Sequence, residues 1–542
     1  MRKIALLLLT LFLLVSLSGC SKGEKISQHT VAEKQVLNWN YPAELTTLDP
    51  SKVSDSYSGD IVGNTMEGLY RLGNNNKLVP ALGVKTKVEA GGLKYTFSLR
   101  KGAKWSNGDP VTASDFVYGW QRTLQKDTAS PSAYLFSGIK NADAIIAGNK
   151  KVTSLGVTAK DDHTLVVELE KKLPYFESLL TIEAFLPQNK RAVETYGEKY
   201  GSAAEKMVYN GPFVVKNWTG TEKSWQLVKN EQYWDKQKVK LSTINFKVNK
   251  STTKAYKLYQ AGKLDYLTLS SKQATKLKKD PGYSVLKQAR TSYLDFNQTK
   301  TTFKNLKIRQ ALSYAIDRDK LVKQIVGGGA QTSLGIVPQG LYEYKGRDFA
   351  EVAQTTAGVT GNKQRAKWLF KQGLAELGVK QLSFTLMSSD DETAKKVAQF
   401  IKEELEETLP NVQVTVQSVS LKQRIAQGQN GSFDIQLTSW GADFADPLSF
   451  LALFTTENSY NFGGWNNTKY NELIKTAQTT DANNKAKRFE DLVKASKLLS
   501  EKQGVIPLYQ ANIPQLKRET IKGLIQNSAG TTNNWKEVYL VK

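Results

Sequence analysis

The sequence YTFSLRKGAKWSNGDPVTASDFV occupies residues 95–117 and contains, in direct succession, the patterns of a strand, a turn and a helix start. Apolar and polar residues alternate over 95–99, which is the period of a half-buried strand. The polar segment 106–110, with its glycine and proline, is typical of a turn. Thr112 and Asp115 have the spacing of a capping box, which predicts that a helix begins after Thr112. This unit therefore predicts a strand followed closely by a helix.

The same two periodicities recur outward from this unit along the chain. Alternation predicts strands over 37–41, 165–169, 382–386 and 412–419, and a hairpin over 213–228. Apolar spacing predicts helices over 60–70 (closing at Gly68), 308–316, 392–405 and 484–499. We expect the 308–316 helix to restart with Asp319 as its cap. Because strand, helix and strand follow one another after residue 382, the predicted fold class is α/β.

The composition is that of a globular chain with a strongly basic surface. Of 542 residues, 40% are hydrophobic and 10% aromatic, and the formal net charge is +24. A chain of this length is expected to form two or more lobes. Its lysines are spread along the sequence instead of gathered with aromatics in one stripe, which argues against nucleic-acid binding. An adhesin that binds the cell wall by charge alone is an alternative, and salt would abolish that binding.

The first twenty residues have the organisation of an export signal. Basic residues precede an apolar run over 4–15, which is shorter than the roughly 20 residues that a spanning helix needs. The segment 17–20, Leu-Ser-Gly-Cys, is similar to a bacterial lipobox. We therefore expect a lipoprotein signal peptide at 1–19, a diacylglyceryl group and palmitate on Cys20, and a flexible tether over 20–35. A plain secretory signal with an incidental cysteine is the alternative.

The sequence contains few groups for catalysis or metal binding. Its two histidines are His29, in the tether, and His163, in a predicted surface turn, so a histidine-based triad is not expected. Cys20 is the one cysteine, which excludes an intramolecular disulfide and a CxxC zinc site. Two SxxK segments, 137–140 and 251–254, lack the companion motifs of penicillin-recognising enzymes. We predict no enzyme, cofactor or metal, although a glycosidase-type pair of carboxylates stays open.

One stretch has the composition of a binding site: FDIQLTSWGADFADP, residues 433–447. A hydrophobic strand runs here into a loop that places Trp440 near Asp443. Trp440 offers a flat apolar wall, Asp443 a negative charge for an ammonium group, and Gly441 room for a ligand backbone. The alternative is a strand-end turn in which the aspartate only caps the backbone.

The chain resembles the bacterial extracellular solute-binding proteins of family 5, and within them the oligopeptide-binding lipoproteins of ABC peptide importers. The segments that carry the resemblance are 95–117, 210–213, 261–265, 308–318 and 440–447. It implies a periplasmic-binding-protein type II fold, in which two lobes close over a ligand and the first lobe contains an extra domain. On this basis lobe I comprises 36–70, 205–291 and 510–542, the inserted domain 71–204, and lobe II 292–509.

The resemblance also implies the binding residues. In oligopeptide-binding members, the aspartate at the position of Asp443 pairs with the peptide α-ammonium, and main chain around 439–441 and 54–56 bonds to the peptide. A family tyrosine that faces the ligand corresponds to Tyr134. The predicted ligand-binding residues are Ser54, Ser56, Tyr134, Ser439, Trp440, Gly441 and Asp443. Leu437 departs from the pattern, because well-known members carry an arginine there, and a ligand carboxylate would lose that partner.

What the resemblance implies for function is a receptor that captures oligopeptides and delivers them to ABC permease subunits. The other expected partner is the membrane, through the lipid anchor, and no nucleic acid is expected. We expect a monomer on the extracellular face of the cell membrane of a Gram-positive bacterium. The alternatives are a signalling peptide, a cell-wall peptide or a nickel chelate on the same scaffold, and a surface hydrolase.

Overall fold

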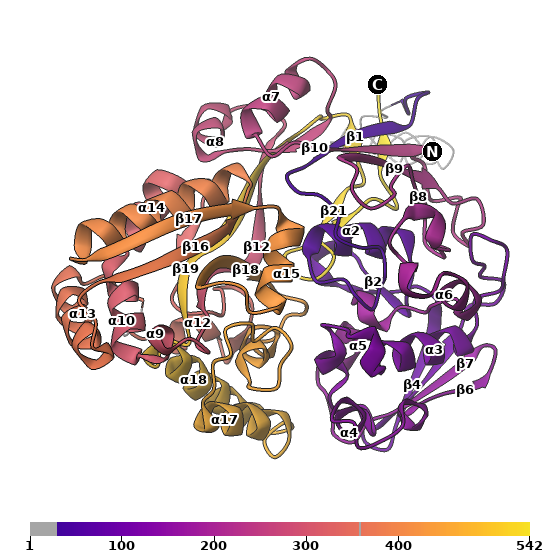
Figure 1. Cartoon of the computed structure of the whole chain (residues 1–542). Coiled ribbons are helices and arrows are strands. Elements are labelled where there is room, and N and C mark those ends of the chain that lie inside the picture. The colour runs from indigo at the N-terminus through magenta and orange to yellow at the C-terminus, as the bar shows by residue number, and fades with distance from the viewer. Residues whose placement is uncertain (1–29, 357–358) are drawn as a thin grey trace, which may run out of the picture.

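A computed structural model describes residues 30–356 and 359–542 of the chain (Figure 1). The predicted signal peptide 1–19, the lipidation site Cys20 and the tether up to residue 29 lie outside the described residues. Within the described ranges, no helix is both long enough and apolar enough to cross a membrane. The architecture is a mixed α/β arrangement, as predicted.

One large sheet runs through the molecule. Its strand order is β17 (Val412–Val419), β16 (Leu382–Ser389), β18 (Ile435–Gly441), β12 (Tyr283–Phe296), β19 (Val505–Lys517), β11 (Tyr266–Thr268), β1 (Val36–Tyr41), β10 (Thr243–Val248), β9 (Ser224–Lys229) and β8 (Phe213–Lys216). A short strand, β13 (Gln331–Thr332), also pairs with β19. The long antiparallel strands β12 and β19 lie between two groups of elements (Figure 1). We call the group that contains β11, β1, β10, β9 and β8 the β1 side, and the group that contains β18, β16 and β17 the β18 side.

The β1 side contains the unit of residues 95–117. Strand β5 (Lys94–Leu99) belongs to a four-stranded antiparallel sheet with β4 (Gly83–Glu89), β7 (Thr164–Glu168) and β6 (Val157–Asp161). Helix α3 (Ala113–Leu124) follows it, and the Thr112 backbone N–H donates to Asp115 Oδ2 at 2.8 Å in a capping box. The predicted strand, turn and helix of residues 95–117 are therefore confirmed. His163 lies in the turn between β6 and β7, as predicted.

The β18 side has the predicted strand, helix and strand sequence. Strands β16 and β17 are parallel and are connected by α14 (Glu392–Thr408). A helix of this length is the usual crossover between two parallel strands. The predicted helices at 308–316 and 484–499 correspond to α10 (Leu306–Ala315) and α18 (Lys485–Glu501). Other helices of this side are α13 (Lys363–Leu377), α15 (Leu421–Gln429), α16 (Leu448–Leu451) and α17 (Thr468–Gln478). The hairpin over 213–228 is also confirmed, as β8 and β9 on the β1 side.

Two local predictions are wrong. The helix expected over 60–70 is α2 (Ser56–Thr65), which begins earlier because the Asp55 carboxylate accepts bonds from the first backbone N–H groups. It ends before Gly68, because the carbonyl of Thr65 accepts a hydrogen bond from the Gly211 N–H at 2.9 Å. The restart after α10 is capped by Asp317, whose Oδ1 accepts from the Lys320 N–H at 2.9 Å, and not by Asp319.

Candidate functional site

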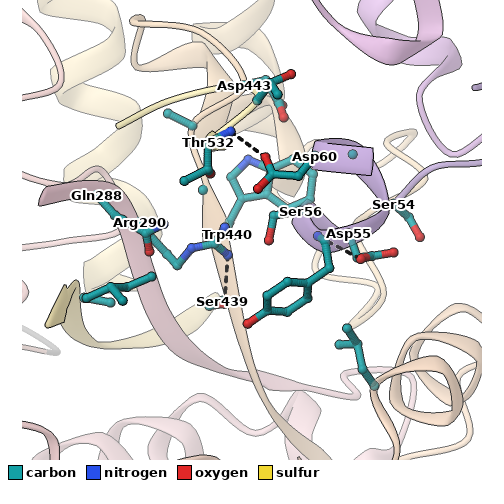
Figure 2. Close-up of a pocket in the computed structure, with 18 of the residues that line it drawn as sticks. Ser54, Asp55, Ser56, Asp60, Gln288, Arg290, Ser439, Trp440, Asp443 and Thr532 are labelled. Carbon is teal, nitrogen blue, oxygen red and sulfur yellow. Dashed lines mark hydrogen bonds between the residues drawn. The ribbon is translucent and has the colours of Figure 1, made fainter. Parts of the chain in front are cut away.

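A cavity of about 390 Å³ lies where the β1 side meets the β18 side. It receives side chains from α2, β12, β18, β19 and the loops beside them (Figure 2). All of the residues predicted to bind ligand line this one cavity: Ser54, Ser56, Tyr134, Ser439, Trp440, Gly441 and Asp443. Segments almost 400 residues apart in the sequence are thus brought together. In the described part of the chain, no cluster of His, Cys, Asp and Glu is placed to hold a metal ion.

Asp443 follows the end of β18 and does not act as a helix cap. Its backbone N–H donates to Ser449 Oγ at 2.8 Å, which fixes the direction of the loop. The capping carboxylate of this turn belongs to Asp446, whose Oδ1 accepts from the Leu448 N–H at 3.0 Å. Asp443 Oδ2 is buried and has no hydrogen-bond partner among the described groups. A buried carboxylate oxygen without a partner is costly, so the site favours a ligand that donates to it.

The electrostatic surroundings of Asp443 agree with that requirement. Burial, and secondarily the nearby Glu183 carboxylate, raise the pKa of Asp443 to about 8. The Arg290 guanidinium and the Tyr134 hydroxyl act in the opposite direction but do not cancel the effect of burial. Burial raises the pKa of Glu183 to about 7 as well. A cationic group placed between these carboxylates would stabilise their charged forms.

Aromatic rings form the wall beside Asp443. The Trp440 and Tyr460 rings meet edge to face with their centroids 4.6 Å apart, and Tyr134 approaches Tyr460 at 5.9 Å. Tyr134 comes from the β1 side, whereas Trp440 and Tyr460 come from the β18 side. The Trp440 indole N–H is buried without a partner in the described chain. This wall therefore combines apolar surface with an unused hydrogen-bond donor.

The N-terminal end of α2 forms another part of the cavity wall. The Asp55 carboxylate accepts from the backbone N–H groups of Tyr57 and Ser58 at 3.0 and 2.9 Å. This cap holds Ser54 and Ser56, which flank Asp55, at the cavity surface (Figure 2). Asp60, one turn further, accepts from the Thr532 backbone N–H at 2.7 Å. Asp55 and Asp60 are thus committed to structure, whereas Asp443 is not.

Leu437 lines the cavity but lies mostly in the hydrophobic core of the β18 side, with 6% of its surface exposed. Two guanidinium groups that the sequence analysis did not select also line the cavity. Arg424 is bound by Ser389, Gln436 and Thr438, and Arg290 by Ser439. No local signal set Arg290 apart, because its strand also contains Lys287 and Asp295. For Glu183 a signal was available, because it interrupts the largely apolar run 179–186.

Outside the cavity, a group of polar contacts joins the two sides. Lys250, which follows β10, donates to both carboxylate oxygens of Asp390 at 2.7 and 2.6 Å and pairs with Glu44 at 3.2 Å. Thr252 donates from its backbone N–H and its hydroxyl to Glu392 at 3.1 and 2.8 Å. Because Asp390 and Glu392 stand at the start of α14, these contacts connect the β1 side to the β18 side. We call this group the Lys250 clasp.

Comparison with known proteins identifies the family. The model of bacterial extracellular solute-binding proteins, family 5 middle, matches residues 77–462. A dipeptide-binding protein of Lactococcus lactis is 36% identical over 94% of this chain and 95% of its own length. The structure of Listeria monocytogenes OppA bound to peptide superposes with a TM-score of 0.91 at 36% identity, over 94% of this chain and 100% of that chain. The type II periplasmic-binding-protein fold is thereby confirmed.

The comparison also distinguishes conformations. The murein tripeptide-binding protein MppA of Escherichia coli matches in one structure with a TM-score of 0.87 at 30% identity, over 95% of this chain and 100% of that chain. Its unliganded open form matches with a TM-score of only 0.61, at 31% identity over 95% and 99%. Because the same relative fits well in one form and poorly in its open form, the present arrangement of the two sides is not the open one.

Proposed function

Since the chain belongs to the bacterial extracellular solute-binding proteins of family 5, we propose that it captures peptides between its two sides and delivers them to an ABC import permease. Residues 36–70, 205–291 and 510–542 form lobe I, 71–204 the inserted domain and 292–509 lobe II in this proposal. The protein binds its ligand without turnover. It acts as a monomer, anchored through a lipid on Cys20 to the outer face of the membrane of a Gram-positive bacterium.

One observation carries the proposal: the partnerless carboxylate oxygen of Asp443 at the edge of a cavity that both sides enclose. A peptide α-ammonium supplies the missing donor and the compensating charge. The backbone of 439–441 and of 54–56 then bonds to the peptide main chain, as in the addition of a strand, so affinity does not depend on one side-chain sequence. Trp440 provides apolar contact for the first side chain.

A direct test is mass spectrometry of the small molecules that the purified protein releases on denaturation, followed by titration of the emptied protein. We expect short peptides with free amino termini, and a 1:1 endpoint when such peptides are added back. A single non-peptide species that blocks peptide titration would contradict the ligand assignment and would favour the nickel-chelate alternative.

Peptide affinity is expected to rise with pH between pH 5 and pH 7. The empty site holds Asp443 with a pKa of about 8, so the carboxyl group is largely protonated over this range. An ammonium ligand needs the ionised form, lowers this pKa on binding and therefore releases a proton. Linkage then predicts up to about a tenfold gain in affinity per pH unit. Calorimetry in two buffers with different ionisation enthalpies counts the released proton.

The matched control for this pH dependence is Asp443→Asn, which has no carboxyl group to ionise. We expect the variant to lose the slope that Asp443 contributes. Equal affinity at pH 5 and pH 7 in the unmodified protein would contradict the assigned role of this carboxyl group.

The Lys250 clasp is expected to slow ligand release. Replacing Lys250 by methionine removes its ion pairs with Asp390 and Glu44, which are partly exposed, and such pairs contribute about 0.2–1 kcal/mol each. Ligand dissociation should accelerate about two- to thirtyfold, with little change in association, because closure is destabilised. Stopped-flow fluorescence measures both rates.

Lys307→Met is the control for the clasp, because Lys307 pairs with Glu376 within the β18 side at 2.5 Å. This variant should leave the dissociation rate unchanged. If both variants release peptide at the same rate, the clasp does not stabilise the closed form.

A further inference from the structure

Arg290 lies at the end of the part of the long strand β12 that pairs with β18. Its partner across this edge is Gly441. On the other edge, pairing of β12 with β19 stops at Lys287 and resumes at Thr291. Arg290 therefore lies in the irregular segment between the two paired parts of β12. Its side chain extends into the cavity toward Ser439 (Figure 2).

The Arg290 guanidinium has few partners for a half-buried cation. Nη1 donates to Ser439 Oγ at 3.2 Å, and across residues 30–356 and 359–542 no carboxylate forms an ion pair with it. Arg122 and Arg488 differ, because each forms two bonds to one buried aspartate, Asp49 or Asp446. Burial lowers the pKa of Arg290, which reflects the cost of this incompletely compensated charge.

The opposite residue leaves room for this side chain. A Cβ atom at Gly441 would lie only 2.8 Å from Arg290 Nη2, so a larger residue would displace the guanidinium. Glycine at this position keeps the guanidinium above β18, beside the main chain that faces the cavity. Three other carboxylates of the cavity are engaged elsewhere: Asp55 caps α2, Asp60 binds the 532–533 backbone and Asp391 caps α14.

The position of Arg290 relative to Asp443 suits a short zwitterion. Asp443 follows Gly441, the cross-strand partner of Arg290, by two residues, and both side chains line the same cavity. The charge of each group also acts on the pKa of the other, so the two groups are close. A ligand ammonium at Asp443 and a ligand anion at Arg290 therefore belong to one short stretch of peptide.

We propose that Arg290 binds a carboxylate of the ligand located one or two residues from its α-ammonium. The carboxylate is the C-terminus of a dipeptide or an acidic side chain near the amino end of a longer peptide. The planar guanidinium can donate two parallel bonds to either group. This inference rests on the proposed function and assigns to Arg290 the carboxylate partner that Leu437 cannot provide.

Matched ligands test the proposal by calorimetry on the full chain. The first pair is Ala-Ala and its C-terminal amide, and the second is Ala-Glu-Ala-amide and Ala-Gln-Ala-amide. In the unmodified protein, the carboxylate member of at least one pair should bind about 10- to 100-fold more tightly. The pair that shows this preference identifies the source of the carboxylate. Arg290→Met should abolish the preference, so that both members of each pair bind with equal affinity.

Arg290→Lys and Arg347→Met are the comparison variants. Lysine keeps the charge but not the paired donors, so part of the preference should remain. Arg347 is exposed on β15 (Arg347–Asp348), and its loss should change nothing. The proposal is overturned if the unmodified protein shows no preference in either pair, if the preference survives in Arg290→Met, or if charged and neutral ligands weaken equally.

The same titrations separate this proposal from the proposed function. If the unmodified protein binds the neutral peptides without preferring a carboxylate, only the role of Arg290 is wrong. If it binds no free-amine peptide at all, the peptide-receptor function itself is contradicted. Both outcomes are measured on the unmodified protein. The two proposals can therefore be separated even if a variant does not fold.

Discussion

Replacing Asp443 by asparagine is expected to weaken the binding of free-amine peptides by about 2–5 kcal/mol, or about 30- to 5,000-fold in Kd. The α-ammonium would remain buried, but its charged partner would be gone. Asparagine has nearly the same shape, so the loss reports the charge and not a cavity. Calorimetric titration with a neutral tripeptide, at the same pH for both proteins, measures the effect.

Asp127→Asn is a suitable control, because Asp127 is exposed and distant from the cavity wall. It should bind the tripeptide as the unmodified protein does. N-acetylation of the peptide removes the ammonium from the other side of the pair, so the acetylated ligand should bind weakly to the unmodified protein and to the Asp443→Asn variant alike. Undiminished binding of free-amine peptide by Asp443→Asn would show that another group holds the amino terminus.

The second large effect is expected at Arg488, which supports the loop that carries Asp443. Arg488 donates to both oxygens of Asp446 at 2.8 and 2.9 Å, and both side chains are less than 10% exposed. Arg488→Met leaves the Asp446 charge buried without its partner, which costs about 3–5 kcal/mol. Chemical denaturation should show this loss on the β18 side, and peptide binding should weaken because the loop is less well held.

Two further variants decide whether the ion pair itself is responsible. Lys494→Met, on the same helix α18, removes an exposed contact to Asp491 at 3.9 Å and should cost less than about 1 kcal/mol. Combining Arg488→Met with Asp446→Leu removes both charges and should recover much of the lost stability. Equal destabilisation by Lys494→Met and Arg488→Met would contradict the account of this loop.

Local structure was largely predictable because its determinants are local. The capping box of Thr112 and Asp115, the alternation of 382–386 and the helical spacing of 308–316 each depend on neighbours within about one or two turns. The failure at residues 60–70 has a tertiary cause. The end of α2 is determined by Gly211, which is 146 residues beyond Thr65 and binds its carbonyl.

The site was less accessible from sequence because its residues meet only through long-range pairing. Trp440 and Asp443 were selected from one local stretch, whereas Ser54 and Tyr134 followed only from the family resemblance. Nothing local connects residue 54 with residue 443. Arg290 was missed for a related reason: it meets Ser439 and Gly441 only through the pairing of β12 with β18, and strand periodicity does not predict which strands pair.

Competition within a mixed peptide library tests the central claim most directly. The purified protein is incubated with equal amounts of short free-amine peptides and their isotope-labelled N-acetyl counterparts, and the complexes are identified by native mass spectrometry. We expect 1:1 complexes that contain almost only free-amine peptides. Retention of neither set, or of both sets equally, would contradict capture of the peptide amino terminus at Asp443.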